Sequence, residues 1–356
     1  MLKQLSLENF RSYEKYHLDF SKTTILIGSN GIGKTNILEA IYLLSTGRSW
    51  RTKHDNETVL WQKDLAKITA KVSNDKETNL EMILQRVPSK DYPYLKLVKV
   101  NGVKKRLTEL LGRLPTVLFS PEELQMISGS PASRRRFLDV LLCQIDKKYT
   151  LALLDLAKVI RGRNKLLYFV KIGRSKVDEL VFWDERLVTL GSFVVKKRQQ
   201  LITKLNDDLT RIYQTLSGFK DDNLVIKYKP TVEPEKFEEM LVANQTREIE
   251  SAVTLFGPHR DDLMFMLNSR DVSTFGSRGE YRSVILAVKM GELEYLKTAT
   301  EHKPILLLDD IFSELDEDRR LHLAKIIDNQ QTIITTTDLD HIEKGLRNKA
   351  KIVELK

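Results

Sequence analysis

The sequence predicts an α/β protein with a helical insertion, and three observations support this fold class. A buried strand, a glycine-rich turn and a helix follow one another over residues 23–47. Helices alternate with short apolar strands over the last hundred residues, as in proteins with a buried parallel sheet. Between these parts, residues 126–220 predict mostly helices, because they carry long helical patterns and few turn signals.

The composition favours a polyanionic partner and a reducing compartment. A chain of 356 residues suggests two or three domains, and 58 Lys and Arg against 49 Asp and Glu give a net charge of +9. The single cysteine, Cys143, excludes an internal disulfide and a Cys-rich zinc site. The N-terminus lacks the apolar core of a signal peptide, and no apolar run approaches the ~18 residues of a membrane span. We therefore expect a cytoplasmic protein without a membrane partner.

The N-terminal part predicts strands around a glycine-rich loop. Apolar residues alternate with polar ones up to Phe20, and "TTILIG" at 23–28 predicts a buried strand. The helix from Lys34 has apolar positions at helical spacing and is expected to end at Gly47. Residues 65–107 predict a meander of strands, in which Asn101-Gly102 marks a two-residue hairpin turn.

The C-terminal part predicts four further strands. Two of them, "AVTLFG" at 252–257 and "LMFMLN" at 263–268, follow a polar connection after the helical stretch. The other two, "PILLLDD" at 304–310 and "QTIITTT" at 331–337, are short apolar runs of the buried parallel type.

The predicted helical stretch contains the most basic segment of the chain. Residues 147–176 hold nine Lys and Arg against Asp155 alone, a net charge of +8. Such a segment is either a solvated helical face or a DNA-facing surface that supplies several phosphate contacts.

A phosphate-binding loop is indicated by "GSNGIGKT", which matches the pattern G-x-x-x-x-G-K-[S/T] in full. Its glycines let backbone N–H groups curl around a phosphate, and the following helix directs its positive end to the same place. Lys34 is expected to span the β- and γ-phosphates of a nucleotide, and the Thr35 hydroxyl to hold Mg²⁺. The predicted nucleotide contacts are Gly28, Ser29, Asn30, Gly31, Ile32, Gly33, Lys34, Thr35 and Asn36.

A pair of carboxylates ends the apolar strand at 304–310. We expect Asp309 to bind Mg²⁺, and Asp310 to orient or deprotonate the attacking water as the catalytic residue. Asp309 follows Lys34 by 275 residues in the sequence, so a large insertion separates the two motifs.

A third motif, "SRGE" at 277–280, lies 32 residues before Asp309. Ser277 and Glu280 form the pattern of a capping box, but the glycine between them costs helix stability. A Ser-x-Gly turn at a helix start, shortly before an acidic strand, is the layout of ABC-type ATPases. In those proteins the turn binds the γ-phosphate held by the other subunit, so Ser277, Arg278 and Gly279 are expected to contact a nucleotide across a dimer interface.

The chain resembles the RecF family, bacterial recombination-repair ATPases whose nucleotide-binding head is similar to those of SMC proteins. Seven stretches in this order carry the resemblance over essentially the whole length. They are "LENFRSY" at 7–13, the phosphate loop, "VLFSPEEL" at 117–124, "GSPASRRRFLD" at 129–139, "GPHRDDL" at 257–263, "GSRGEYRS" at 276–283 and "LLLDDIFSELD" at 306–316.

The resemblance implies an ABC/SMC-type head, a mixed sheet with a β-meander, split in sequence by a helical arm. The expected division is head over residues 1–125, arm over 126–250 and head again over 251–356. RecF-like proteins bind ATP with Mg²⁺, dimerise on ATP and bind duplex DNA near single-strand gaps. They act with RecR and RecO to load recombinase, and their slow, DNA-stimulated ATP hydrolysis works as a timer.

The chain departs from related patterns at three positions. ABC transporters carry Ser-Gly-Gly-Gln where this chain has Arg278 and Glu280 in place of the first Gly and the Gln. Asp310 replaces the usual catalytic Glu, which points to slow hydrolysis. Gln125 is the candidate for the glutamine loop. The stretch "GPHRDDL" is either a turn with a polar brace or part of a DNA or partner surface.

Two other functions fit the phosphate loop less well. A nucleoside kinase normally has its acidic strand much closer to the loop and needs a second substrate site. A transporter ATPase shares the signature turn, but it has no need of the basic helices and leaves "LENFRSY" unexplained.

Overall fold

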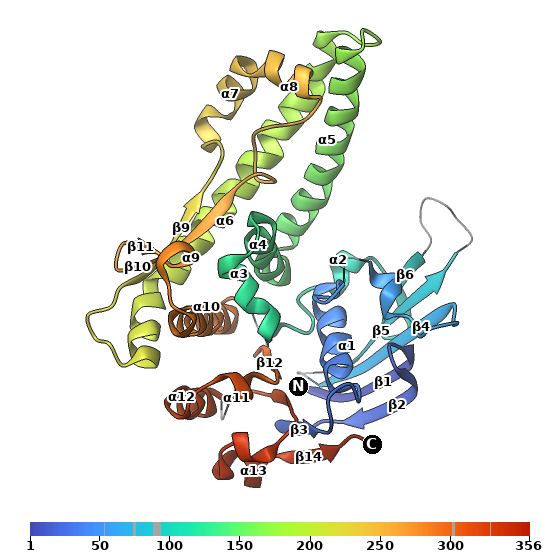
Figure 1. Cartoon of the computed structure of the whole chain (residues 1–356). Helices are drawn as coiled ribbons and strands as arrows, with labels where there is room; N and C mark the ends of the chain where they lie inside the picture. Colours follow the sequence, from blue (N-terminus) through green and yellow to red (C-terminus); the bar gives the residue numbers. More distant parts are fainter. Residues whose placement is uncertain (53, 74–75, 88–93, 301–302, 328) are drawn as a thin grey trace. The chain divides into compact units, whose positions relative to one another are not determined.

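The chain folds into two compact units, which are described separately. The structure, a computed structural model, describes all residues except 53, 74–75, 88–93, 301–302 and 328 (Figure 1). The first unit comprises Met1–Leu124, Thr215–Gly218 and Ile285–Lys356, and the second comprises Gln125–Gln214 and Phe219–Val284. Residues 251–284 thus pack with the second unit. The division expected from the sequence, head over 1–125, arm over 126–250 and head over 251–356, stays a proposal about functional domains.

A parallel sheet forms one part of the first unit. Its strand order is β14-β3-β13-β12-β8, and every neighbouring pair is parallel. The strands predicted at 23–28, 304–310 and 331–337 are confirmed as β3, β12 and β13, whereas β8 and β14 were not predicted as strands. The bounds are β3 Thr23–Ile27, β8 Thr116–Phe119, β12 Ile305–Asp309, β13 Thr332–Thr336 and β14 Lys351–Glu354.

An antiparallel sheet forms the other part of the first unit and confirms the predicted meander. Its order is β2-β1-β4-β5-β6-β7. Asn101 and Gly102 join β6 to β7 with φ values of 51° and 78°, which two-residue hairpin turns require. The bounds are β1 Leu2–Phe10, β2 Tyr13–Asp19, β4 Leu65–Ser73, β5 Glu77–Arg86, β6 Tyr94–Val100 and β7 Val103–Lys105.

The helix α1, Lys34–Thr46, contacts strands of both sheets, and most of its buried positions are apolar. It ends at Gly47, whose φ of 76° allows the left-handed cap predicted from the sequence. The other helical elements of this unit are η1 Asp55–Thr58, α2 Leu107–Leu110, η2 Pro121–Leu124, α11 Ile311–Glu314, α12 Glu317–Ile327, η5 Leu339–His341 and α13 Lys344–Lys349.

The second unit is mainly helical, as predicted, and its longest helices run antiparallel (Figure 1). Tyr149 near the start of α5 bonds to Arg198 of α6, and Arg163 further along α5 bonds to Asp184 near the start of α6. The helical elements that lie wholly in this unit are α3 Gln125–Ser128, α4 Pro131–Ile145, α5 Lys147–Lys171, η3 Val177–Leu180, η4 Pro234–Lys236, α7 Phe237–Ala243, α8 Gln245–Ser251 and α9 Val272–Phe275. Two further helices belong to both units: the last residues of α6 Val181–Ser217 and residues 285–299 of α10 Arg278–Ala299 are grouped with the first unit. Within the described residues, no helix has an apolar stretch long enough to span a membrane.

A small antiparallel sheet of order β11-β10-β9 completes the second unit. Its strands are β9 Leu224–Lys229, β10 Asp262–Leu267 and β11 Arg270–Asp271, so the strand predicted at 263–268 is confirmed. The strand predicted at 252–257 is wrong. Ala252 adopts a left-handed φ of 54°, and Thr254 N donates to the Asn164 side chain instead of a neighbouring strand.

Candidate nucleotide-binding site

The phosphate-loop backbone adopts conformations that require glycine. The loop lies between β3 and α1, and Gly31 and Gly33 have φ values of 83° and 113°. A Cβ atom at Gly33 would lie 2.6 Å from the Tyr13 hydroxyl oxygen, so the site excludes a side chain on steric grounds as well. The predicted loop and helix start are therefore confirmed as local structure.

Lys34 is buried at the start of α1 and folds back on the loop. Its ammonium group donates to the backbone oxygens of Gly28, at 2.6 Å, and Ser29, at 2.9 Å. Burial lowers the Lys34 pKa, and the carboxylates of Asp310 and Asp309 act in the opposite direction. The cation thus shares its surroundings with both carboxylates.

Asp309 joins the phosphate loop to the acidic strand. The Thr35 hydroxyl donates to Asp309 Oδ1 at 2.9 Å, and the Thr335 hydroxyl donates to the same oxygen at 2.7 Å. Thr335 lies opposite Asp309 in the pairing of β13 with β12. Burial raises the Asp309 pKa, while the two hydroxyl bonds act to lower it. The structure therefore places Thr35 and Asp309, the two predicted Mg²⁺ ligands, side by side.

Asp310 has a buried carboxylate oxygen at the end of β12. Its backbone has a left-handed φ of 51°, and its N–H donates to the Thr335 hydroxyl at 2.9 Å. Among the described residues, Asp310 Oδ1 is buried and makes no hydrogen bond. Burial raises the Asp310 pKa, which the charges of Lys34 and His341 partly offset. A carboxylate held in this way is a better proton acceptor than an exposed one.

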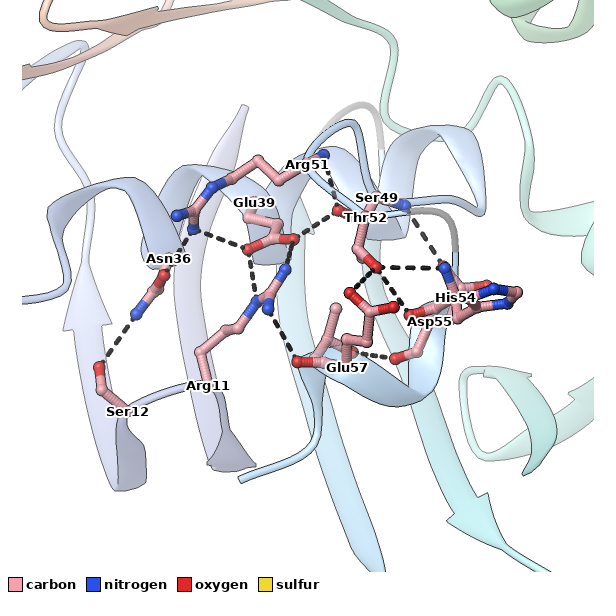
Figure 2. A network of polar contacts seen from close by, with 11 residues as sticks. Arg11, Ser12, Asn36, Glu39, Ser49, Arg51, Thr52, His54, Asp55 and Glu57 are labelled. Atoms are coloured by element: carbon pink, nitrogen blue, oxygen red, sulfur yellow. Dashed lines mark hydrogen bonds and ion pairs between the residues drawn. The ribbon is translucent and has the colours of Figure 1, made fainter. Parts of the chain in front are cut away.

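The orientation of Asn36 depends on a buried carboxylate on α1. Figure 2 shows Glu39 between two guanidinium groups, with Arg11 Nε at 2.8 Å and Arg51 Nη1 at 3.2 Å from Oε2. Arg51 Nη1 also donates to Asn36 Oδ1, and Asn36 Nδ2 donates to Ser12 Oγ. The network fixes Asn36 directly after the phosphate loop. Sequence reasoning missed Glu39, although a lone acidic residue within an apolar helix was the available signal.

The motif at 277–280 forms the predicted capping box. Ser277 N donates to Glu280 Oε2 at 2.6 Å, and Glu280 N donates to Ser277 Oγ at 3.2 Å. These bonds lower the Glu280 pKa. Ser277, Arg278 and Gly279 are all exposed at the N-terminus of α10. They belong to the second unit, whereas the phosphate loop and acidic strand belong to the first.

Two glycines flank Ser277 for different reasons. A Cβ at Gly276 would lie 2.6 Å from both Tyr281 Cε1 and Val272 O, so packing within the chain explains this glycine. A Cβ at Gly279 would meet only Ser277 Oγ, at 3.9 Å. No contact with a described residue requires glycine at 279, although glycine in a helix costs about 0.5–1 kcal/mol relative to alanine.

The stretch 257–263 forms a polar brace in the second unit. Asp262 accepts two hydrogen bonds from Arg134, at 2.6 and 3.0 Å, and the Pro258 carbonyl accepts from Arg198. Asp261 is buried and accepts from the Thr231 N–H and from the Tyr228 hydroxyl. This motif therefore pairs with the motif at 129–139 through Arg134, as the polar-brace alternative expects, and a part in DNA or partner binding stays a prediction. The side chain of Gln125, the glutamine-loop candidate, lies outside what the structure describes.

The basic side chains of the segment 147–176 are exposed, with one exception. Arg163 is fully buried and bonds to Asp184 and Glu248, each at 2.6 Å. The sequence charge of +8 therefore overstates the surface charge of the segment, because a buried ion pair presents no cation to solvent. The exposed basic residues are Lys147, Lys148, Lys158, Arg161, Lys165, Lys171, Arg174 and Lys176.

Comparison with known proteins decides the family. The RecF/RecN/SMC N terminal domain family matches residues 1–354. The DNA replication and repair protein RecF of Lachnoclostridium phytofermentans is 40% identical over 343 residues, covering 96% of this chain and 93% of that protein. The chain belongs to the RecF family. The RecF of Latilactobacillus sakei is 37% identical over 363 residues, covering 97% of this chain and 94% of that protein.

Solved structures agree with RecF membership. A structure of the recombination mediator protein RecF with ATP, from the RecFOR pathway, has a TM-score of 0.88 and 33% identity. It covers 96% of this chain and 93% of that chain. The Smc head domain of Pyrococcus furiosus shares the fold at 18% identity and a TM-score of 0.54. The predicted ABC/SMC-type head fold is confirmed.

Proposed function

We propose that this chain is an ATP-dependent DNA-binding protein of recombinational repair and replication restart. It binds duplex DNA near single-strand gaps, dimerises on ATP and helps RecR and RecO load recombinase, and slow DNA-stimulated ATP hydrolysis resets it. The observation that carries the proposal is the bond between Thr35 and Asp309, which unites the phosphate loop with the acidic strand. The RecF structure with ATP supports the same assignment.

The residues around Thr35 fit ATP with Mg²⁺. Thr35 and Asp309 offer a hydroxyl and a carboxylate oxygen, the hard ligands that Mg²⁺ prefers, so these two residues would hold the ion, and the ion would supply positive charge to neutralise the phosphates. Lys34 supplies a cation to the β- and γ-phosphates. The N–H groups of residues 28–36 and the N-terminus of α1 supply further positive partial charge.

Asp310 is the proposed acceptor for the attacking water. Its buried Oδ1 has no hydrogen-bond partner among the described residues, so it is available to a water molecule. Burial raises its pKa and thus its basicity, but its side chain is one methylene shorter than the usual Glu. Slow turnover is the expected result.

The proposed dimer places Ser277, Arg278 and Gly279 against the nucleotide held by a second copy. All three residues are exposed at a helix N-terminus, which favours anions. The openness around Gly279 leaves its backbone accessible to a phosphate group. The exposed lysines and arginines of α5 form part of the proposed DNA-binding surface, where they would contact phosphates.

Duplex DNA binding with and without ATP, scored together with oligomeric state, tests the proposal. We expect ATP to produce dimers and to strengthen DNA binding, and the affinity to fall steeply as salt rises. Ser277→Arg should leave a monomer that still binds ATP, since Ser277 faces the nucleotide of the other copy. ATP-dependent dimers of this variant would contradict the sandwich arrangement, and a flat salt dependence would argue against the basic helices as the DNA surface.

A further inference from the structure

The helix α5 has a buried side and an exposed side, and each follows helical spacing. The buried side carries Ala152, Leu156, Val159 and Arg163. The exposed side carries a row of residues spaced alternately three and four apart, which we name the α5 stripe: Leu151, Leu154, Lys158, Arg161, Lys165 and Tyr168. The stripe lies opposite the buried side on the helix, so the packing of α5 within its own unit leaves it open to solvent.

Both ends of the α5 stripe are apolar. Leu151 and Leu154 are 42% and 45% exposed at one end, and Tyr168 is 51% exposed at the other. Ile172, 41% exposed, follows Tyr168 by four residues directly after the helix ends. Single exposed apolar side chains are common, but four in one row are typical of a surface that binds another protein. From residue 151 to residue 168 the stripe is ~26 Å long, at about 1.5 Å per residue.

The centre of the α5 stripe is basic. It consists of Lys158, Arg161 and Lys165. Asp155, the only acidic residue of α5, pairs with Lys158 at 2.9 Å. Within the described part of the chain, neither Arg161 nor Lys165 belongs to an ion pair, and Lys165 Nζ lies 5.7 Å from the centre of the Phe169 ring. The centre therefore attracts carboxylates or phosphates, whereas the two ends attract apolar side chains.

The order of residues in the α5 stripe favours one kind of occupant. A second copy of this chain fits poorly, because twofold pairing of the two stripes would set Arg161 against Arg161. The phosphates of DNA would suit the basic centre but would leave both apolar ends exposed. A helix with acidic residues in its centre and apolar residues at both ends would match the whole stripe. Helices with such alternate spacing pack side by side over several turns.

We propose that the α5 stripe is a docking site for an amphipathic helix of a partner protein, with an acidic centre and apolar ends. The inference does not depend on the ATP-dependent dimer. Lys158, Arg161 and Lys165 also belong to the proposed DNA-binding surface, so the partner helix and DNA would compete for α5. Competition of this kind would let a bound partner release DNA from the helix.

Fluorescence anisotropy with labelled synthetic helices tests this docking site on the full chain. Each peptide is as long as α5, 25 residues, with leucines at both ends of its stripe and either three glutamates or three lysines in the centre. The α5 stripe has the same order of apolar and basic residues in both directions, so one peptide tests both orientations. The lysine peptide should bind at least about tenfold more weakly, since three attractive pairs become repulsive.

The double variant Leu154→Ser with Tyr168→Ser removes one apolar residue from each end of the stripe. Both side chains are exposed, so the fold should persist, and circular dichroism checks this. Affinity for the glutamate peptide should fall about tenfold or more, while affinity for duplex DNA should stay unchanged. Val242→Ser is the matched control, because Val242 is 72% exposed on α7 of the same unit, and it should bind the peptide normally.

A selective loss of peptide binding in the double variant, with normal binding in Val242→Ser, supports the docking site. Absent binding of the glutamate peptide, equal binding of the two peptides or an unaffected double variant would each overturn it. An equal loss of DNA and peptide binding in the double variant would also overturn it, because the apolar ends would then serve DNA. If the unchanged chain binds the peptide selectively but binds no DNA, the docking site stands and the proposed DNA-binding function is wrong.

Discussion

The Thr35 hydroxyl donates a hydrogen bond of 2.9 Å to Asp309 Oδ1, across 274 residues of sequence. This bond joins the last residue of the phosphate loop to the end of β12. Because β13 lies between β3 and β12 in the sheet, the two motifs need a contact that passes over one strand. Thr35 makes this contact from the first turn of α1. Thr335 pairs with Asp309 across the neighbouring strand β13, and its hydroxyl donates to the same carboxylate oxygen.

Lys34→Ala should weaken ATP binding by about 10- to 100-fold, since charged hydrogen bonds contribute about 1.5–3 kcal/mol. Dimerisation and DNA binding should be lost with it. An equilibrium titration with labelled ATP measures the effect. Lys15→Ala, which removes an exposed lysine from β2, is the control and should bind ATP normally. Equal ATP affinity in the two variants would contradict the phosphate-loop assignment.

Thr335→Val should destabilise the protein by about 1–3 kcal/mol and slow ATP hydrolysis, because Asp309 loses a donor and the Asp310 N–H loses its acceptor. Thr332→Val on the same strand is a matched control. Thr332 is fully buried, and its hydroxyl makes no hydrogen bond among the described residues, so its loss should be neutral or stabilising. Urea unfolding and turnover assays compare the two, and similar behaviour would rule out the positioning role of Thr335.

Asp310→Asn should slow hydrolysis by about 100-fold or more, since an amide does not accept the proton of water as a carboxylate does. ATP binding and the ATP dimer should persist, and the dimer should decay more slowly. Single-turnover hydrolysis together with light scattering measures both quantities. Turnover at or above the unchanged rate would refute the catalytic role of Asp310.

Gly279→Ala should raise the stability of the fold by about 0.5–1 kcal/mol, because alanine favours the helix and the added methyl group meets open space. The same methyl group should weaken the ATP dimer by obstructing the approach of the second copy's phosphate. Gly276→Ala should instead destabilise the fold, since its Cβ collides with Tyr281 and Val272. Thermal unfolding and sedimentation separate the effects, and an unaffected dimer in Gly279→Ala would count against trans contact at this turn.

His259 should make the fold sensitive to acid. Burial lowers its pKa from 6.5 to about 4, while its Nε2 lies 3.1 Å from Thr254 O. Above pH 6.5 the imidazole is neutral in both states. As the pH falls from about 6.5 to 4, the unfolded chain binds a proton that the folded chain does not, so stability falls across this window and levels off below it.

His259→Gln keeps a donor for Thr254 O but does not titrate. Its unfolding midpoint in urea should therefore depend less on pH between 4 and 6.5 than that of the unchanged chain. The difference in the pH-dependent part should be on the order of 2–3 kcal/mol, from about 1.36 kcal/mol per pKa unit. Parallel curves for the two proteins would show that His259 does not carry the acid sensitivity.

The local features of this protein followed from the sequence. The glycine spacing of residues 28–35 predicted the loop and helix start, and Asn101-Gly102 predicted the hairpin turn. Ser277 and Glu280 predicted the capping box. Each depends on backbone conformations and hydrogen bonds within a few residues, so short-range chemistry determines it.

The long-range features were decided by tertiary contacts. The prediction of a strand at 252–257 was wrong because side chains, and not a neighbouring strand, accept the hydrogen bonds of its backbone N–H groups. The acceptors are the side chains of Asn164 and Glu248. Arg163 appeared as one cation of a basic segment, yet Asp184 and Glu248 bury and neutralise it.

The nucleotide site divides in the same way. The sequence by itself determined the phosphate loop, the acidic strand and the cap at Ser277. Each of these features depends on backbone conformations and hydrogen bonds among residues that are close in the sequence. Only the tertiary structure decided that Thr335 and Glu39 support the site, because strand pairing and burial depend on residues far apart in the chain.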